Sequence, residues 1–270
     1  MMKRKFNILD LLQYIADGVV ASIPQKTPSQ DKLQNCRIVS HRGEHDNKTI
    51  MENTLPAFDR VLKSGVWAIE LDIRWTKDLH PVVIHDADCQ RIFDSPMIVS
   101  EHSLAELQNA LPQIPSLQQV IKRYGKKIHL MVELKQEEFP DIDRQRNTLK
   151  TMFEDLTPGQ DFHLISLEPE LFKVFDIIPK SSMMPIAETN TTAISQHAIL
   201  EGYAGISGQY LLMSDRLIKK HAYHQQKIGT GFTRSRYCFY RELNRDVEWI
   251  FTNHAIKLSN IRRKLLSKFK

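Results

Sequence analysis

From Arg37 onward the chain alternates between short apolar segments typical of strands and longer segments typical of helices. This alternation is the pattern of parallel βα units, and eight such units close naturally into a barrel. We therefore expect an α/β fold, a (β/α)8 TIM barrel, for which 270 residues suffice to form a full core. The expected strands span residues 37–41, 68–74, 128–135, 162–167, 183–187, 203–207, 227–232 and 248–252.

Helix signals lie between these strands. The first helix is expected from Glu52 to about Lys63, where Ser64-Gly65 ends it. Residues 76–80 turn the chain back into 81–85, so that His85 lies on a hairpin beside the second strand. A small insertion, about residues 87–126, follows between strands 2 and 3 and contains short helices at 104–110 and 117–124. Further helices are expected at 169–175, 193–201, 214–226 and 237–244.

Two acidic residues, Glu70 and Asp72, interrupt an otherwise apolar strand. Because side chains two apart on a strand point to the same face, the two carboxylates share that face. Buried carboxylates that lie together must take up protons, find cationic partners or hold a metal. The third strand ends in Glu133 and Lys135, again two apart, which brings a third carboxylate and a cation to the same place.

The spacing of these carboxylates leaves two interpretations open. They could form a buried ion-pair cluster with Arg74 or Lys135, or they could bind a cation. Glu70, Asp72 and Glu133 offer only oxygen ligands, which suit Mg²⁺, Ca²⁺ or Mn²⁺ better than Zn²⁺.

Two of the 11 histidines, His41 and His85, each close a strand-like segment near the carboxylates. A lone histidine at a strand end is more often a structural group. The paired placement favours a catalytic role, because imidazole titrates where a general acid or base must.

Seven short motifs resemble, in the same order, those of the glycerophosphodiester phosphodiesterase family. They are His41-Arg42-Gly43, Glu52-Asn53-Thr54 with Ala57-Phe58, Glu70-Leu71-Asp72, Thr76-Lys77-Asp78, His85-Asp86, Ile114-Pro115-Ser116-Leu117 and Glu133-Leu134-Lys135. A weaker likeness continues to Thr252, so the resemblance covers most of the chain after residue 36.

The resemblance implies a barrel with its active site at the carboxyl ends of the strands, and one divalent cation, Mg²⁺ or Ca²⁺ with Mn²⁺ possible. The implied reaction is the metal-dependent hydrolysis of glycerophosphodiesters to glycerol 3-phosphate and an alcohol, the activity of a phosphoric diester hydrolase. The site comprises three metal ligands, two acid–base histidines and two substrate-binding cations: Glu70, Asp72 and Glu133; His41 and His85; Arg42 and Lys135. The sequence does not say which histidine is the acid.

The sequence departs from the family pattern at three places. Leu79 stands where a glycine usually completes a turn, so that turn must avoid a positive φ or absorb strain. Gly231-Phe232-Thr233-Arg234 replaces a late Trp-Thr-Val motif, and Asn253 replaces an aspartate after Thr252. These changes concern the pocket for the glycerol or alcohol group and leave the phosphoryl chemistry unaffected.

Other polar residues are given structural interpretations. Glu52 and Asn53 could line the mouth of the site or cap the first helix, and the cap is favoured. His221 and His224 lie three apart on a predicted helix, a spacing open to a metal, but a solvated face is favoured. His45 is expected at the surface.

Composition narrows the class of protein. Hydrophobic content of 41% and charged content of 26% are ordinary for a soluble globular chain. The net charge of +5 is concentrated at the two ends, without the aromatic interleaving that would suggest nucleic-acid binding. The three cysteines, of which Cys89 has no evident base partner, predict a reducing, cytoplasmic location. The oligomeric state cannot be predicted from the sequence.

The first 35 residues are expected to form a helix and a connector, and residues 36–270 the barrel domain. Polar residues such as Asn7 and Asp10 interrupt the apolar positions, which excludes a signal peptide and a membrane span. Phe6, Leu9 and Leu12 begin a helical apolar spacing that continues to Val20, so this amphipathic helix is expected to cover the fold or contact a partner. Weak peripheral membrane contact through the basic ends remains an alternative.

Two other functions stay open at this point. One is a lysophospholipase D-like hydrolase acting at a membrane surface, suggested by the basic ends and the altered late motif. The other is a non-catalytic barrel that binds a metal or phosphate, against which the second histidine argues.

Overall fold

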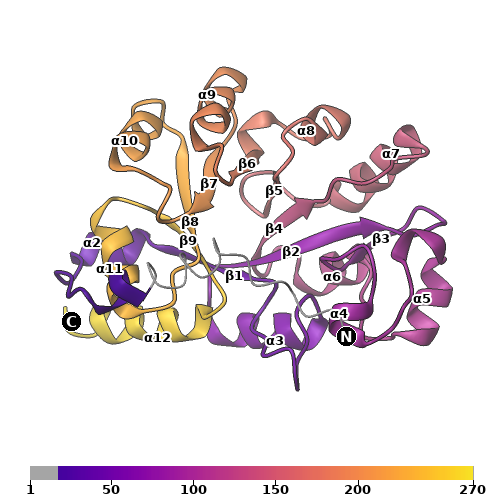
Figure 1. The fold of residues 1–270 in the computed structure, drawn as a ribbon, viewed down its shortest axis with the longest axis horizontal. Coiled ribbons are helices and arrows are strands. Elements are labelled where there is room, and N and C mark those ends of the chain that lie inside the picture. The colour runs from indigo at the N-terminus through magenta and orange to yellow at the C-terminus, as the bar shows by residue number, and fades with distance from the viewer. Residues whose placement is uncertain (1–17, 270) are drawn as a thin grey trace.

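Eight parallel strands close into a barrel in the computed structural model, which describes residues 18–269 (Figure 1). Among these residues the order round the ring is β1-β9-β8-β7-β6-β5-β4-β2, and β1 pairs with β2 to close it. The strands are β1 (Arg37–His41), β2 (Ala68–Trp75), β4 (His129–Leu134), β5 (Phe162–Ser166), β6 (Met183–Ala187), β7 (Gly205–Gln209), β8 (Lys227–Gly231) and β9 (Trp249–Thr252). The expected (β/α)8 TIM barrel is confirmed.

The short strand β3 (Pro81–Val83) pairs antiparallel with β2, as the predicted hairpin requires. In the turn between β2 and β3, Leu79 has a φ of +62°, which is a strained conformation for a non-glycine residue. The Thr76 hydroxyl supports this turn by lying 2.6 Å from Asp78 Oδ1 and by accepting the His80 N–H at 2.9 Å.

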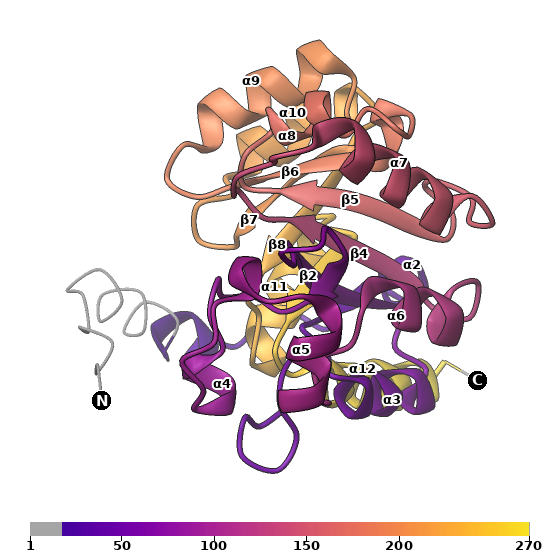
Figure 2. The same cartoon turned by 90° about the vertical axis from the view of Figure 1, so that its right-hand side faces the viewer.

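Helices connect the strands and cover the outside of the ring. They are α2 (Gln30–Asn35), α3 (Leu55–Ser64), α4 (Gln90–Phe93), α5 (Leu104–Ala110), α6 (Leu117–Tyr124), α7 (Ile142–Phe153), α8 (Leu171–Val174), α9 (Thr191–Glu201), α10 (Asp215–Tyr223), α11 (Arg236–Asn244) and α12 (Ala255–Leu266), with 3₁₀ turns at Val99–Glu101 and Lys180–Ser182. Figure 2 shows the insertion helices α4 and α5 on one side of the barrel, and α3 beside α12 below it. No helix within residues 18–269 is both long and apolar enough to cross a membrane.

Local signals set several helix ends as expected. Helices α5 and α6 each begin with a capping box, Ser103 with Glu106 and Ser116 with Gln119. Helix α3 ends at Gly65, whose φ of +67° is the left-handed conformation that glycine adopts easily. The two helices predicted within the insertion, α5 and α6, therefore have the predicted bounds.

Four helices were not predicted. The short insertion helix α4 begins at Gln90 without a side-chain cap. Helix α12 begins without a side-chain cap, so its start carries no clear sequence signal, and α7 follows strand β4 in a polar stretch. Helix α2 lies where a polar connector was expected, and it buries Leu33 completely. The predicted amphipathic helix lies largely outside the described residues, and the division at residue 35 stays a prediction.

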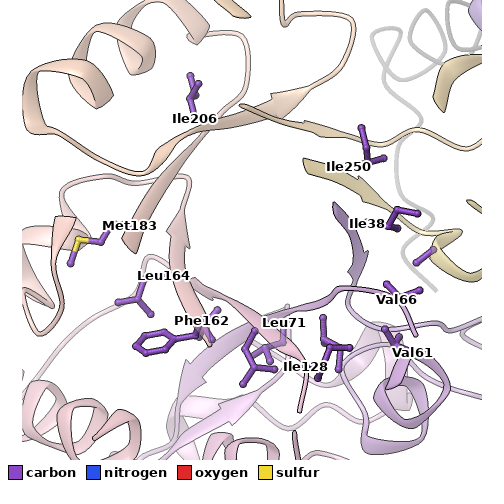
Figure 3. Packing of buried hydrophobic residues seen from close by; sticks show 14 of the residues in the cluster. Ile38, Val61, Val66, Leu71, Ile128, Phe162, Leu164, Met183, Ile206 and Ile250 are labelled. Atoms are coloured by element: carbon purple, nitrogen blue, oxygen red, sulfur yellow. The ribbon is translucent and has the colours of Figure 1, made fainter. Parts of the chain in front are cut away.

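The alternation of side chains separates two apolar layers. Ile38, Leu71 and Ile250 belong to the layer between the sheet and the helices, and Figure 3 shows them outside the ring of strands. The alternate positions, including Val39 and Phe251, fill the barrel interior. On β1, β2 and β4 this inward set ends in polar groups at the carboxyl ends, namely His41, Asp72 and Glu133.

Two buried histidines lie at the lower end of the interior. His129 Nδ1 is 2.8 Å from the Gln160 carbonyl oxygen and must donate to it, so His129 Nε2 is left to accept from His163 Nδ1, also at 2.8 Å. Both rings contact tryptophans, His129 with Trp67 and His163 with Trp249. Burial lowers the pKa of His129 to about 4 and that of His163 to about 3.

Acid is expected to destabilise the fold through this pair. Because both folded-state pKa values lie below the ordinary 6.5, their contribution is complete above about pH 6.5 and is lost as the pH falls toward about 4. The loss should be on the order of 3 kcal/mol for each buried imidazole. Urea unfolding of the His163→Gln variant, measured across this range, should show a weaker pH dependence than the parent. The exposed His224→Gln serves as control, and equal slopes in parent and His163→Gln would contradict the assignment.

Candidate functional site

The predicted site residues come together at the carboxyl ends of β1, β2 and β4. The register of these strands places Asp72 level with Glu133, where β2 pairs with β4, and His41 level with Glu70, where β1 pairs with β2. Glu70 lies one inward step below Asp72. Strand register alone therefore assembles the acidic group.

The three carboxylates are buried and close together. Glu70, Asp72 and Glu133 are 1%, 0% and 6% exposed, and one oxygen from each lies within 4.8 Å of the others. Burial, and then the charge of Asp72, raises the pKa of Glu70 well above its usual value and raises that of Glu133 as well. Burial and mutual repulsion thus disfavour the charged forms of Glu70 and Glu133.

Positive charge reaches Asp72 from two sides. Lys135 Nζ lies 2.7 Å from Asp72 Oδ1 and also contacts Glu133, while Arg42 Nε lies 3.2 Å from Asp72 Oδ2. Burial alone would raise the pKa of Asp72, but these two cations hold it below its usual range. Of the two ion-pair partners that the sequence left open, Lys135 is found at the cluster. Arg74 instead donates from Nε to the His85 carbonyl oxygen.

Arg42 and Asn53 hold the carboxylates through strained backbone. Arg42 has a φ of +56°, which lets its N–H donate to Glu70 Oε2 at 2.9 Å. Asn53 has a φ of +57°, and its Nδ2 donates to Asp72 Oδ2 at 2.8 Å. The prediction that Asn53 caps the first helix is wrong, because Thr54 occupies the N-cap position.

Glu52 does not cap the helix either. It joins Arg42, which contacts the carboxylate cluster, to Arg91. It is 5% exposed and accepts hydrogen bonds from Arg42 at 2.9 Å, Arg91 at 2.6 Å and Asn47 at 2.7 Å. Burial would raise its pKa, but the guanidinium groups lower it to about 2. Because Glu52 stands just before a helix, the sequence favoured a cap and its place in this network was not predicted. Glu52 does, however, stand within one of the family motifs.

The two predicted histidines are held in different ways. His85 Nδ1 lies 2.7 Å from Asp86 Oδ1, and Asp86 in turn pairs with Arg91. His41 Nδ1 lies 2.7 Å from Asn253 Oδ1, and its Nε2 lies 3.9 Å from Glu70 Oε2. Burial and then Arg42 lower the pKa of His41 to about 4. A neutral imidazole therefore stands beside the acidic group.

The remaining candidates lie apart from the site. His221 is fully buried between Ser195, at 2.9 Å, and Gln226, at 2.8 Å, so its predicted place on a solvated face is wrong, whereas His224 is exposed. His45 is half-buried, where an exposed position was predicted.

The thiol Cys89 is also separate from the site chemistry. Burial raises its pKa to about 11, which disfavours the nucleophilic thiolate.

The acidic cluster meets the requirements of a hard divalent cation. Its donors are all carboxylate oxygens, and Glu70 Oε1 is buried without a hydrogen-bond partner among the described residues. A bound cation would give Glu70 Oε1 an electrostatic partner. Its charge would also favour the ionised forms of Glu70 and Glu133.

Comparison with known proteins shows which family this chain resembles. The model of the glycerophosphoryl diester phosphodiesterase family matches residues 41–171. The glycerophosphodiester phosphodiesterase of Caldanaerobacter subterraneus is 36% identical over 110 residues, which are 36% of this chain and 44% of that protein. That of Bacillus subtilis is 24% identical over 283 residues, which are 94% of this chain and 95% of the relative. The chain thus spans less than half the length of the first of these relatives.

Solved structures share the fold. The glycerophosphodiester phosphodiesterase of Thermotoga maritima has a TM-score of 0.70 at 18% identity and covers 84% of this chain and 98% of its own. A phosphodiesterase of Oleispira antarctica, in complex with the product sn-glycerol-3-phosphate, has a TM-score of 0.70 at 18% identity and covers 83% of this chain and 95% of its own. The family resemblance seen in the sequence motifs is confirmed.

Removing the Glu52 carboxylate should destabilise the protein. Glu52→Ala leaves two guanidinium groups without their shared acceptor and should cost about 3 kcal/mol in the free energy of unfolding, measured with urea. Glu52→Gln keeps one acceptor and should cost less. The exposed Glu138→Ala is the control, and a Glu52→Ala variant as stable as this control would show that the network contributes little.

Proposed function

With the resemblance to the glycerophosphodiester phosphodiesterase family as premise, we propose that this chain hydrolyses glycerophosphodiesters to glycerol 3-phosphate and an alcohol. One observation carries the proposal. Two histidines, each held through Nδ1 by a separate partner, stand at an acidic cluster of buried carboxylates. A site that only bound a cation or phosphate would need neither imidazole.

We propose that Glu70, Asp72 and Glu133 hold one divalent cation, Mg²⁺ or Ca²⁺, with Mn²⁺ as a further candidate. When bound, such an ion neutralises charge on the phosphoryl oxygens and polarises the phosphorus. Arg42 and Lys135 add fixed positive charge at the same place, and they suit an anionic diester. In the absence of a ligand these two cations are held by Asp72.

The histidines supply the proton transfers that cleavage of a phosphodiester requires. The nucleophile must lose a proton and the departing alkoxide must gain one. We assign these two transfers to the Nε2 atoms of His41 and His85, because their Nδ1 atoms already have partners. Water is the attacking group for complete hydrolysis.

Two arginines of the basic segment proposed to contact a membrane bind groups of the protein itself. Arg262 donates to the carbonyl oxygens of Leu33 and Gln34, and Arg263 contacts Asn260. The three cysteines are free and buried, which supports a reducing, cytoplasmic location. A small-molecule diester is therefore favoured over a membrane lipid as substrate.

The activity should depend on a divalent cation. The purified protein is expected to release glycerol 3-phosphate from glycerophosphocholine or glycerophosphoethanolamine, to lose this activity in EDTA, and to regain it with Mg²⁺, Ca²⁺ or Mn²⁺. A folded protein that releases nothing with any of these ions would argue against the proposal. Release from lysophosphatidylcholine alone would instead identify a lysophospholipase D.

Removing one ligand or one histidine should abolish catalysis without unfolding the chain. Glu70→Ala and His85→Ala are each expected to lower kcat by about 100-fold or more, since general acid–base groups and metal ligands contribute at this level. His224→Ala, an exposed histidine far along the chain, is the matched control. Near-parental kcat in either site variant, with circular dichroism unchanged, would remove that residue from the mechanism.

A further inference from the structure

The first and last strands of the barrel bring two distant residues together. Strand β1 pairs in parallel with β9 through Val39 with Phe251 and Ser40 with Thr252. The next positions are His41 and Asn253. Each lies two residues after an inward-facing residue, Val39 or Phe251, and so shares its face. The register places an amide beside the imidazole of the site.

This amide determines which ring nitrogen carries the proton. His41 Nδ1 and Asn253 Oδ1 are 2.7 Å apart, and an amide oxygen only accepts, so the Nδ1 atom must donate. In the neutral ring, Nε2 is then the bare nitrogen, and it faces Glu70 Oε2 at 3.9 Å.

A second residue restrains the orientation of the same ring. Phe232 follows β8, and its ring centroid lies 4.6 Å from that of His41 at an interplanar angle of 57°. The Thr252 hydroxyl, fully buried, donates to the Thr233 carbonyl oxygen and accepts the His254 N–H at 3.0 Å. This hydroxyl ties the end of β9 to the segment after β8, so Asn253 and Phe232 are fixed relative to each other.

We propose that Asn253 and Phe232 are positioning residues for His41, with Asn253 selecting the Nδ1–H tautomer and Phe232 fixing the plane of the ring. The kinetic consequence rests on the function proposed above, while the tautomer does not. During turnover Nδ1 keeps its proton, and the proton that moves is carried by Nε2 alone. An asparagine does this without adding a charge, unlike the aspartate of the related motif.

The tautomer can be measured without any assay of activity. In ¹⁵N-labelled protein with Mg²⁺ present, the neutral His41 ring is expected to show a protonated Nδ1 and a bare Nε2, assigned against His41→Gln. In Asn253→Leu, which removes the acceptor, the signal should shift toward a mixture of tautomers. A His41 ring protonated at Nε2 in the parent, or an unchanged ring in Asn253→Leu, would overturn the proposal.

Kinetics test the consequence. Asn253→Ala should lower kcat by about 10- to 100-fold and change KM by less than about 2-fold, the size expected for a residue that orients a catalytic imidazole. Asn253→Asp, which keeps an acceptor for Nδ1–H, should recover most of this loss, and Phe232→Leu should give an intermediate kcat. The control is Asn260→Ala on α12, an exposed asparagine of the same region.

The two proposals can fail separately. If the parent hydrolyses no diester but the ¹⁵N signals are as expected, the positioning of His41 stands and the reaction is wrong. If the parent is active and Asn253→Ala has parental kcat, the positioning role is wrong and the reaction stands.

Discussion

The charge of Asp72 lies where no solvent reaches it, and the neighbouring residues are arranged to hold that charge. A buried carboxylate is costly unless it is paired and hydrogen-bonded. Lys135, Arg42 and Asn53 provide these contacts. Two of the three do so from a backbone conformation that non-glycine residues rarely adopt, which persists only where the surrounding structure imposes it. The local strain at the site thus follows from one buried charge.

The sequence is informative wherever the period-two alternation of a strand decides the outcome. The spacing of Glu70 and Asp72 places both inside the barrel, and the repeat of that spacing at Glu133 and Lys135 brings the third carboxylate and its cation alongside. Alternation with eight strand-like segments was sufficient to predict the closed ring.

The sequence misleads where a local signal competes with a distant partner. Glu52 and Asn53 precede a helix and resemble caps, yet their partners are Arg91 and Asp72, residues that only the tertiary fold brings near. His221 lies on a polar helix, but Ser195 of the neighbouring helix and Gln226 give it buried hydrogen bonds. Helical periodicity reports which face is apolar on average, and it does not reveal a single polar residue whose partners come from elsewhere.

The pairing of β1 with β9 also affects the order in which the site forms during synthesis. A ribosome delivers the carboxylates Glu70, Asp72 and Glu133 before it delivers β9 and Asn253. Until β9 is made, β1 lacks one of its two neighbouring strands and His41 lacks the Asn253 amide. The nascent chain therefore carries the acidic residues before it has the oriented site, which requires β9.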